Sequence, residues 1–351
     1  MVRGSSVSIL LALAFVVAVA IGCATPSLGP AKRPPMRLAP AAEPGSLDQA
    51  ANPFPNWPLD PTVALDLLRN GEAEIRSVKA AGGGTTGAER HEVFYPARNI
   101  QFKVKWKAMP VLRLDGFNNS PRKEIASFAI QRLFLDPEDY VAPSSTMRCY
   151  AIGPYRETHP MASATLDEID CVLGVASVWV FDVTLPDVAY DEERFLTDRS
   201  YATFMSNLNV FTYILDHRDG REGNFLIAKD VSRPQTFSVD NGIAFGPLFF
   251  NYFVPNWNKL RVAAVRASTI DRLRTVERKD LDFLAVVDQL QVDDQRMLVP
   301  VPSGPVMDPN DGATFEDGVV QFGLTTREID GVYKRIGKLI QGVDSGRIPV
   351  F

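Results

Sequence analysis

The sequence predicts an α+β fold in two parts, an antiparallel sheet with one helix followed by a mainly helical region. Two patterns carry this prediction. Between residues 74 and 183, five strand-like runs and one helical segment occur, and the run over residues 99–109 alternates apolar and polar residues with the period of two that is typical of strands. From Asp191 onward, apolar residues recur mainly at helical spacing. The chain has 351 residues, of which 46% are hydrophobic, so it can bury a core for such a fold.

Residues 1–22 resemble an export signal. A short basic start at Arg3 precedes one apolar run over residues 8–22, whereas a stable membrane span needs roughly 20 apolar residues. The run ends in the letters AIGC, which resemble the bacterial lipobox, whose cysteine receives a diacylglycerol. We therefore expect Cys23 to be lipidated and to anchor the protein in the bacterial cell envelope, facing the periplasm or the exterior. Cleavage after Ala20, or an uncleaved anchor, is the alternative.

Residues 23–57 are typical of a tether. Prolines recur throughout this stretch, and few large apolar residues precede Phe54. A folded domain is expected over residues 58–351, with an N-terminal part over about 58–185 and a C-terminal part over about 186–351.

The folded domain is predicted to start with a short amphipathic helix that opens at Asp60-Pro61 and stops at Asn70-Gly71. Two strands follow, over residues 74–79 and 92–95. The loop between them contains Gly82, Gly83 and Gly84. Glycines permit the positive φ that turns backbone N–H groups toward a phosphate. A surface hairpin turn is the more common explanation for such a loop.

The next predicted strand, over residues 99–109, carries apolar residues on one face and three lysines on the other. These lysines are Lys103, Lys105 and Lys107. Lysines facing solvent on an edge strand protect against aggregation, and we expect this role for two of the three. A helix follows from Pro121 with Glu124 in its first turn, where a carboxylate favours the helix dipole. Glu124 is also placed to pair with a lysine of the preceding strand.

Two further strands are predicted, over about residues 141–152 and 172–183. Cys149 lies within the strand-like run 146–152, and Cys171 begins the strand-like run 171–179. If the strands are adjacent and antiparallel, an oxidising compartment would join the two cysteines in a disulfide. Two buried thiols are the equal alternative, and no spacing in the chain suggests zinc.

The C-terminal part is predicted to be mainly helical. Four segments have helical spacing of apolar residues, namely 195–215, 258–274, 279–290 and 326–342.

Residues 217–224 have the letters HRDGREGN, and two short predicted strands follow, over 225–228 and 235–239. A hairpin of this length returns Asp240 to the point where the chain left Asn224. Asn224 and Asp240 would then hold one cation between them, because Mg²⁺ prefers oxygen ligands.

Asp219 is the candidate base, since phosphoryl transfer needs a carboxylate within hydrogen-bond reach of the attacking hydroxyl. Asp216 is its rival, although it lies three residues earlier. His217 is expected to brace the loop.

Residues 217–224 match the protein-kinase catalytic loop H-R-D-x-x-x-x-N letter for letter. The later Asp240-Asn241-Gly242 resembles the metal-binding motif of a group of atypical kinases, in which Asp-Asn-Gly replaces Asp-Phe-Gly. This group includes type II phosphatidylinositol 4-kinases, the Golgi casein kinase of the secretory pathway and the spore-coat protein kinases. Their lysine strand tends to have an aromatic-Lys-Pro motif, which Trp106-Lys107-Ala108 approaches without the proline. The resemblance covers residues 74–250.

This resemblance implies a two-lobed protein-kinase-like fold that transfers phosphate from ATP, with Mg²⁺ or Mn²⁺, to a protein. Asp219 would be the base, and Asn224 and Asp240 the metal ligands. Lys107 would bind phosphate with Glu124 as its partner, and the glycines at 82–84 would cover the phosphates.

Two alternatives stay open. The first is a catalytically silent kinase-fold lipoprotein that binds a partner in the envelope, which the scarcity of ATP outside the bacterial cytoplasm favours. The second is a phosphoinositide-type lipid kinase, although no basic amphipathic helix suited to an anionic membrane is visible.

Composition and motifs disfavour two function classes. The net charge of -5 and the pI near 5.4 provide no basic field for nucleic acid. The Gly-x-Ser-x-Gly motif of serine hydrolases does not occur. His91 and His159 are expected on the surface.

Overall fold

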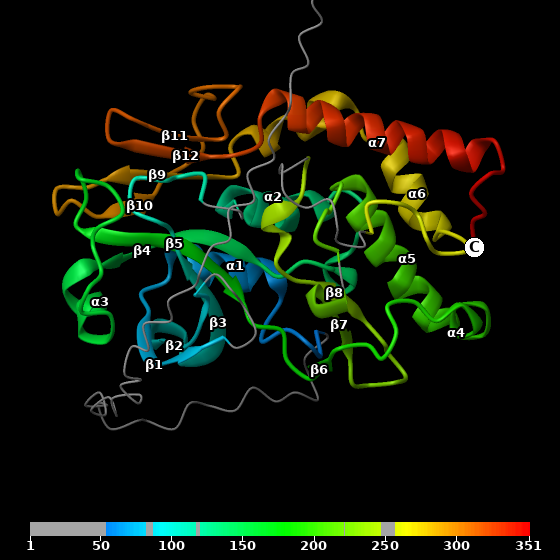
Figure 1. Ribbon diagram of the computed structural model, residues 1–351, viewed down its shortest axis with the longest axis horizontal. Coiled ribbons are helices and arrows are strands. Elements are labelled where there is room, and N and C mark those ends of the chain that lie inside the picture. The colour runs from blue at the N-terminus through cyan, green and yellow to red at the C-terminus, as the bar shows by residue number, and fades with distance from the viewer. Residues whose placement is uncertain (1–53, 82–86, 117–119, 221, 247–256) are drawn as a thin grey trace, which may run out of the picture. The chain divides into compact units, whose positions relative to one another are not determined.

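A computed structural model describes residues 54–351 apart from 82–86, 117–119, 221 and 247–256 (Figure 1). All of the described residues belong to one compact unit. The predicted signal, most of the tether with Cys23, and the glycines at 82–84 lie outside the described residues. Within the described part of the chain, no helix combines the length and the apolar character needed to cross a membrane.

The N-terminal half is built on a five-stranded antiparallel sheet with the order β1-β2-β3-β5-β4. Its strands are β1 (Glu74–Ala80), β2 (Glu89–Tyr95), β3 (Ile100–Ala108), β4 (Ser145–Ala151) and β5 (Cys171–Val178). In β3, Phe102, Val104 and Trp106 are buried and alternate with the three lysines, as the period of two predicted. The position of β3 differs from the expectation of an edge strand, because β3 pairs with β2 on one side and β5 on the other.

Three helices accompany this sheet, α1 (Pro61–Asn70), α2 (Pro121–Gln131) and α3 (Ile152–Thr158). The start of α1 follows from its sequence, because the Asp60 carboxylate accepts the N–H groups of Thr62 and Val63. Nearly every residue of α2 is buried, including its charged first turn. Since α2 packs against β4 and β5 and also contacts the segment after β8, it connects the sheet with the second half of the chain.

The second half begins with two helices, where the sequence predicted a single helix over residues 195–215. These are α4 (Glu192–Thr197) and α5 (Arg199–Ile214). Asp198 separates them, because its carboxylate accepts the N–H groups of Ser200 and Tyr201 and so starts a new helix. A three-stranded antiparallel sheet follows the order β6-β7-β8. Its strands are β6 (Val183–Thr184), β7 (Phe225–Ala228) and β8 (Thr236–Ser238).

Residues 288–322 form a four-stranded antiparallel sheet, so the prediction of a mainly helical C-terminal part is wrong over this stretch. The sheet has the order β10-β9-β12-β11. Its strands are β9 (Asp288–Val292), β10 (Leu298–Pro300), β11 (Ala313–Glu316) and β12 (Val319–Phe322). The predicted helix over 279–290 is instead a 3-10 helix, η6 (Arg278–Ala285), followed by β9. Leu281, Leu284, Val287 and Leu290 recur every three residues, so their spacing imitates a helix that continues into the strand.

Two helices complete the fold, α6 (Ala267–Arg274) and α7 (Thr326–Asp344), which pack on each other at the yellow and red end of the chain (Figure 1). The predicted start of α6 at Asn258 is nine residues too early. Capping explains the start of α7, because Thr325 and Glu328 form a reciprocal capping box. Four single-turn 3-10 segments connect other elements, namely η2 (Pro96–Arg98), η3 (Pro137–Asp139), η4 (Glu222–Asn224) and η5 (Asn241–Ile243).

The folded part begins before residue 58, where the sequence predicted the end of the tether. Phe54, Asn56 and Trp57 are buried. The Trp57 ring packs edge-on against Phe237, with ring centroids 5.1 Å apart. Large aromatic side chains among prolines were the signal that the tether had already ended.

Cys149 and Cys171 lie on the paired strands β4 and β5. Their Cα atoms are 5.6 Å apart and their sulfur atoms are bonded in a disulfide. The antiparallel pairing that the sequence suggested therefore brings the two cysteines together.

Candidate functional site

The candidate site is centred on an ion pair between β3 and the residue that follows the β7–β8 hairpin. Lys105 Nζ on β3 bonds to a carboxylate oxygen of Asp240. Lys107 lies two residues further along the same strand and on the same face, because side chains alternate in a strand. Lys103 is exposed. Two of the three lysines therefore reach the site, and the expectation that two would face solvent is wrong.

The start of α2 is packed on the segment that contains Asp240. The backbone N–H of Ser120 donates to the carbonyl oxygen of Gly242 at 2.9 Å. The Glu124 carboxylate accepts a hydrogen bond from the backbone N–H of Asn241 and interacts with the charges of Lys105 and Lys107. Glu124 is only 6% exposed. The predicted pairing of Glu124 with the lysine strand is thus present as a cluster of two ammonium groups and two carboxylates, in which Glu124 is buried and the Asp240 side chain is 39% exposed.

The hairpin formed by β7 and β8 brings Asp240 back to Asn224, as the spacing predicted. Phe225 pairs with Ser238, and the backbone N–H of Val239 donates to the carbonyl oxygen of Asn224 at 2.9 Å. Asp240 itself adopts a left-handed backbone with φ of 60°. For a residue other than glycine this conformation is unusual, and such positions concentrate at functional sites.

The loop between α5 and β7 is fixed by hydrogen bonds from within the predicted motif. The side-chain N–H of Asn224 donates to the carbonyl oxygen of Asp219 at 2.8 Å. The ring nitrogen Nδ1 of the buried His217 accepts the backbone N–H of Asp219 at 3.2 Å. Burial lowers the pKa of His217 to about 4, so the ring is neutral at pH 7 and acts as this acceptor. His217 braces the loop, as predicted.

Arg218 and Asp216 pair with each other in this loop. Arg218 Nη2 lies 3.1 Å from a carboxylate oxygen of Asp216. The other oxygen of Asp216 accepts a hydrogen bond from the Asn258 side chain at 2.7 Å. Both oxygens of Asp216 are therefore engaged.

Opposing charges and burial set the protonation of the cluster. Burial raises the pKa of Glu124, with Lys105 and Lys107 opposing and Asp240 adding to the effect. Burial acts in the same direction on Asp240, but the ammonium of Lys105 outweighs it and holds the pKa of Asp240 below its usual value. For Lys105, the attraction of Glu124 and Asp240 outweighs burial and raises the pKa.

Lys107 differs from Lys105 in its hydrogen bonding. Burial lowers the pKa of Lys107, although Glu124 and Asp240 attract its charge. Its buried Nζ has no hydrogen-bond partner among the residues that the structure describes. The sequence favoured Lys107 as the partner of Glu124, whereas the structure places both lysines near that carboxylate and gives the ion pair with Asp240 to Lys105.

Sequence reasoning missed the contacts that hold α2 at its N-terminus. Arg122 donates to both carboxylate oxygens of Glu328, at 2.7 and 3.2 Å, and to Asp115 at 2.7 Å. Lys123 Nζ lies 3.4 Å from Glu328. Glu328 belongs to the capping box of α7, so these pairs connect α2 to α7 next to Glu124. The signal in the sequence was the run Arg122-Lys123-Glu124 at the start of an otherwise apolar helix.

The expectation that His91 lies on the surface is wrong. His91 is 1% exposed, because it shares a face of β2 with the buried Val93 and Tyr95. Its Nε2 lies 3.0 Å from one carboxylate oxygen of Glu89, and Nε2 of the partly exposed His159 lies 2.7 Å from the other. Burial acts to raise the pKa of Glu89, but its bonds to the two histidines outweigh burial and lower it.

The candidate site therefore combines Lys105 and Lys107, the buried carboxylate of Glu124, and the neighbouring Asn224 and Asp240. In the part of the chain that the structure describes, no three side chains of His, Cys, Asp or Glu are grouped to hold a metal ion. Asn224 and Asp240 remain a pair of oxygen donors. No model of a known protein family matches this chain, and no curated protein matches it in sequence. Its chemistry is therefore inferred from the geometry of these residues.

Proposed function

We propose that the protein is an ATP- and Mg²⁺-dependent phosphotransferase with a two-lobed kinase-like fold, and that its acceptor is a protein. The observation that carries this proposal is Lys107. Burying an ammonium group without a hydrogen bond costs free energy, so such a group suggests a ligand that completes its bonding. A phosphate oxygen is the complementary ligand, because ammonium and phosphate form charge-assisted hydrogen bonds.

The neighbours of Lys107 fit a nucleotide phosphate. Glu124 and Asp240 attract the charge of Lys107 and partly oppose the lowering of its pKa by burial. The Glu124 carboxylate is fixed in position, because Glu124 belongs to α2 and accepts a hydrogen bond from the backbone N–H of Asn241. A carboxylate fixed in this way can orient a lysine ammonium group. In this proposal Lys107 binds phosphate, and Lys105 holds Asp240 ionised.

Asn224 and Asp240 fit a divalent cation, since both supply oxygen atoms and the β7–β8 hairpin holds them at neighbouring backbone positions. The bound Mg²⁺ would neutralise the developing charge on the transferred phosphoryl group. The lowered pKa of Asp240 keeps its carboxylate ionised and ready to ligate.

Asp219 would accept the proton of the acceptor hydroxyl. Its backbone is held on both sides, because its N–H donates to His217 and its carbonyl accepts from Asn224. A base fixed in this way satisfies the geometric requirement of general base catalysis. The contact between Asn224 and Asp219 also couples the position of the base to that of the proposed metal ligand.

The proposed location is the bacterial cell envelope, with lipidated Cys23 as the anchor. The support is the apolar run that ends in AIGC at residues 20–23. A disulfide between Cys149 and Cys171 agrees with an oxidising compartment.

The test is an incubation of the full-length protein with labelled ATP and Mg²⁺, together with a nucleotide-induced thermal shift. We expect magnesium-dependent stabilisation and autophosphorylation in the wild type. Asp240→Ala should lose the magnesium-dependent shift. Asp219→Ala should keep the shift but transfer phosphate at least about 100-fold more slowly.

Asp230→Ala is the matched control, because this exposed aspartate lies in the β7–β8 turn between the two motifs. It should behave as the wild type. If the wild type shows neither shift nor label, the protein is a silent binding module and the proposal is wrong. Label in phosphoinositide vesicles but not in protein would instead identify a lipid kinase.

A further inference from the structure

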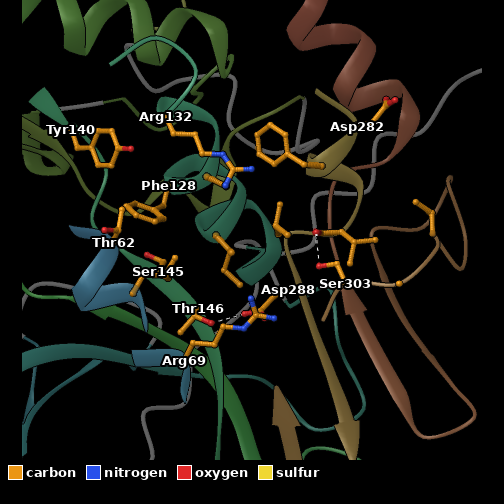
Figure 2. Close-up of a pocket in the computed structure, with 18 of the residues that line it drawn as sticks. Thr62, Arg69, Phe128, Arg132, Tyr140, Ser145, Thr146, Asp282, Asp288 and Ser303 are labelled. Carbon is orange, nitrogen blue, oxygen red and sulfur yellow. Dashed lines mark hydrogen bonds and ion pairs between the residues drawn. The ribbon is translucent and has the colours of Figure 1, made fainter. Parts of the chain in front are cut away.

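A cavity of about 470 Å³ lies beside α2, and none of the four residues of the charge cluster lines it. Four residues of α2 line it, namely Ile125, Phe128, Ala129 and Arg132. They are spaced i, i+3, i+4 and i+7, which places them on one face of the helix. The opposite walls come from α1, the start of β4, and the segment from η6 to β9 (Figure 2). The volume lies within the range of ligand sites, about 300–1,000 Å³.

The middle of the cavity is apolar, whereas its two ends are charged. The apolar part of the wall is formed by Leu65, Ile125, Phe128, Val286 and Val287. In Figure 2, Asp288 lies at one end with Arg69 and Thr146, and Arg132 lies toward the other. An elongated ligand with one polar end matches this distribution.

The charges at the Asp288 end are already matched within the protein. One carboxylate oxygen of Asp288 lies 3.3 Å from Arg69 Nη2, and the other accepts the Thr146 hydroxyl at 2.6 Å. The Asp288 end of the cavity therefore offers no uncompensated charge to a ligand. Asp282 also lines the cavity but lies away from Asp288, at the upper right of Figure 2, and it pairs with Arg278 at 2.6 Å.

Arg132 is the unmatched charge. Its guanidinium lies over the Phe283 ring, 3.9 Å from the ring centroid, which fixes its position at the cavity. Within the described residues, no carboxylate pairs with Arg132, and Tyr140 is the neighbour that affects its charge. Arg132 is exposed to solvent, so its guanidinium can pair with an anionic head group at the solvent-facing end of the cavity while the apolar part of the ligand is buried.

We propose that this cavity binds a medium-chain organic carboxylate, with its alkyl tail between α2 and the η6–β9 segment and its carboxylate on Arg132. Burial of the alkyl tail supplies most of the affinity, because each methylene group removed from water contributes favourably to the binding free energy. The ion pair fixes the orientation. This site does not depend on the proposed phosphotransferase activity, since none of Lys105, Lys107, Glu124 and Asp240 lines it.

Isothermal titration calorimetry of the full-length protein with decanoate tests the proposal. We expect saturable binding with one decanoate per chain. Octanoate should bind about tenfold more weakly, because it buries two fewer methylene groups. Arg132→Gln should weaken decanoate binding about fivefold, and Arg132→Lys should restore part of the loss.

Ala129→Trp adds a large ring on the cavity face of α2 and should abolish binding, while circular dichroism confirms that the variant is folded. Arg98→Gln is the matched control, because it removes the same charge from an exposed arginine on η2. It should leave binding unchanged. No heat of binding up to about 1 mM decanoate, or equal binding by wild type, Arg132→Gln and Ala129→Trp, would overturn the proposal.

Discussion

At the scale of single residues, the three lysines of β3 lie on the same face of the strand but in three different environments. Lys103 is exposed, Lys105 pairs with Asp240, and the buried Nζ atom of Lys107 has no hydrogen-bond partner among the described residues. Because the three side chains are identical and lie on one strand, each lysine variant serves as a control for the others. Comparing the three variants therefore separates effects on nucleotide binding from effects on the free energy of unfolding.

Lys107→Met should raise the free energy of unfolding by about 1 kcal/mol, because it removes a buried donor that lacks a partner. The same variant should lose the thermal shift caused by Mg²⁺ and ATP. Urea denaturation and thermal melting measure the two effects. An increase in stability together with a loss of binding is typical of a residue retained for function.

Lys105→Met should have the opposite effect on stability, since it leaves Asp240 without its partner. Lys103→Met should change stability by less than about 0.5 kcal/mol. If Lys107→Met destabilises the protein and leaves nucleotide binding intact, Lys107 is not the phosphate ligand.

His217 makes the stability of the protein depend on pH. Burial lowers its pKa to about 4 in the folded state, against about 6.5 in the unfolded chain. Between these values the unfolded chain binds more protons. The free energy of unfolding should therefore fall as the pH drops from about 6.5 to about 4, by on the order of 3 kcal/mol from this residue.

Urea denaturation at a series of pH values measures this dependence, and His217→Gln should flatten it. Nuclear magnetic resonance gives an independent readout, because the ring signals of His217 should not shift between about pH 7 and about pH 5. A titration midpoint near 6.5 in the folded protein would contradict the prediction.

At the scale of elements, α2 is held between the charge cluster and α7. Arg122 and Glu328 are only 7% and 14% exposed, and their bond joins the first turns of the two helices. A second arginine pair also involves α7, between Arg274 of α6 and Asp344, but these side chains are 38% and 53% exposed. Both are pairs of an arginine and a carboxylate, but only the pair of Arg122 and Glu328 is largely buried.

Arg122→Met should lower the free energy of unfolding by about 3 kcal/mol, because it leaves Glu328 buried with fewer partners. Arg274→Met should cost less than about 1 kcal/mol, as is usual for an exposed ion pair. Urea denaturation of both variants measures the difference. Equal losses would show that burial does not determine the strength of the contact between α2 and α7.

At the scale of the whole molecule, one covalent bond closes the loop that contains α3. The disulfide joins Cys149 and Cys171, which are 22 residues apart in the sequence. Reduction should lower the free energy of unfolding by about 3 kcal/mol, the value typical of a loop of this length. Denaturation with and without a reductant measures the loss. A variant with both Cys149→Ser and Cys171→Ser should not respond to the reductant, and an unchanged wild type would contradict the prediction.

The sequence by itself determined the features that depend on near neighbours in the chain. The period of two identified β3, and the length of the segment after Asn224 was enough to predict that a hairpin returns Asp240 to it. The strand-like runs at β4 and β5 predicted strands on which Cys149 and Cys171 could meet. Each of these predictions needs only local geometry, which the backbone repeats wherever the same pattern occurs.

Only the tertiary structure decided how deeply each residue is buried and what faces it. Lys103, Lys105 and Lys107 share one face of a strand, so periodicity could not show which of them meets Asp240. The spacing of three from Leu281 to Leu290 could not reveal that the chain leaves a helix for a strand. The cavity beside Arg132 depends on α1, α2 and residues 282–306, which are distant in the sequence. Burial and charge pairing arise from contacts between distant segments, and a local pattern contains no information about those partners.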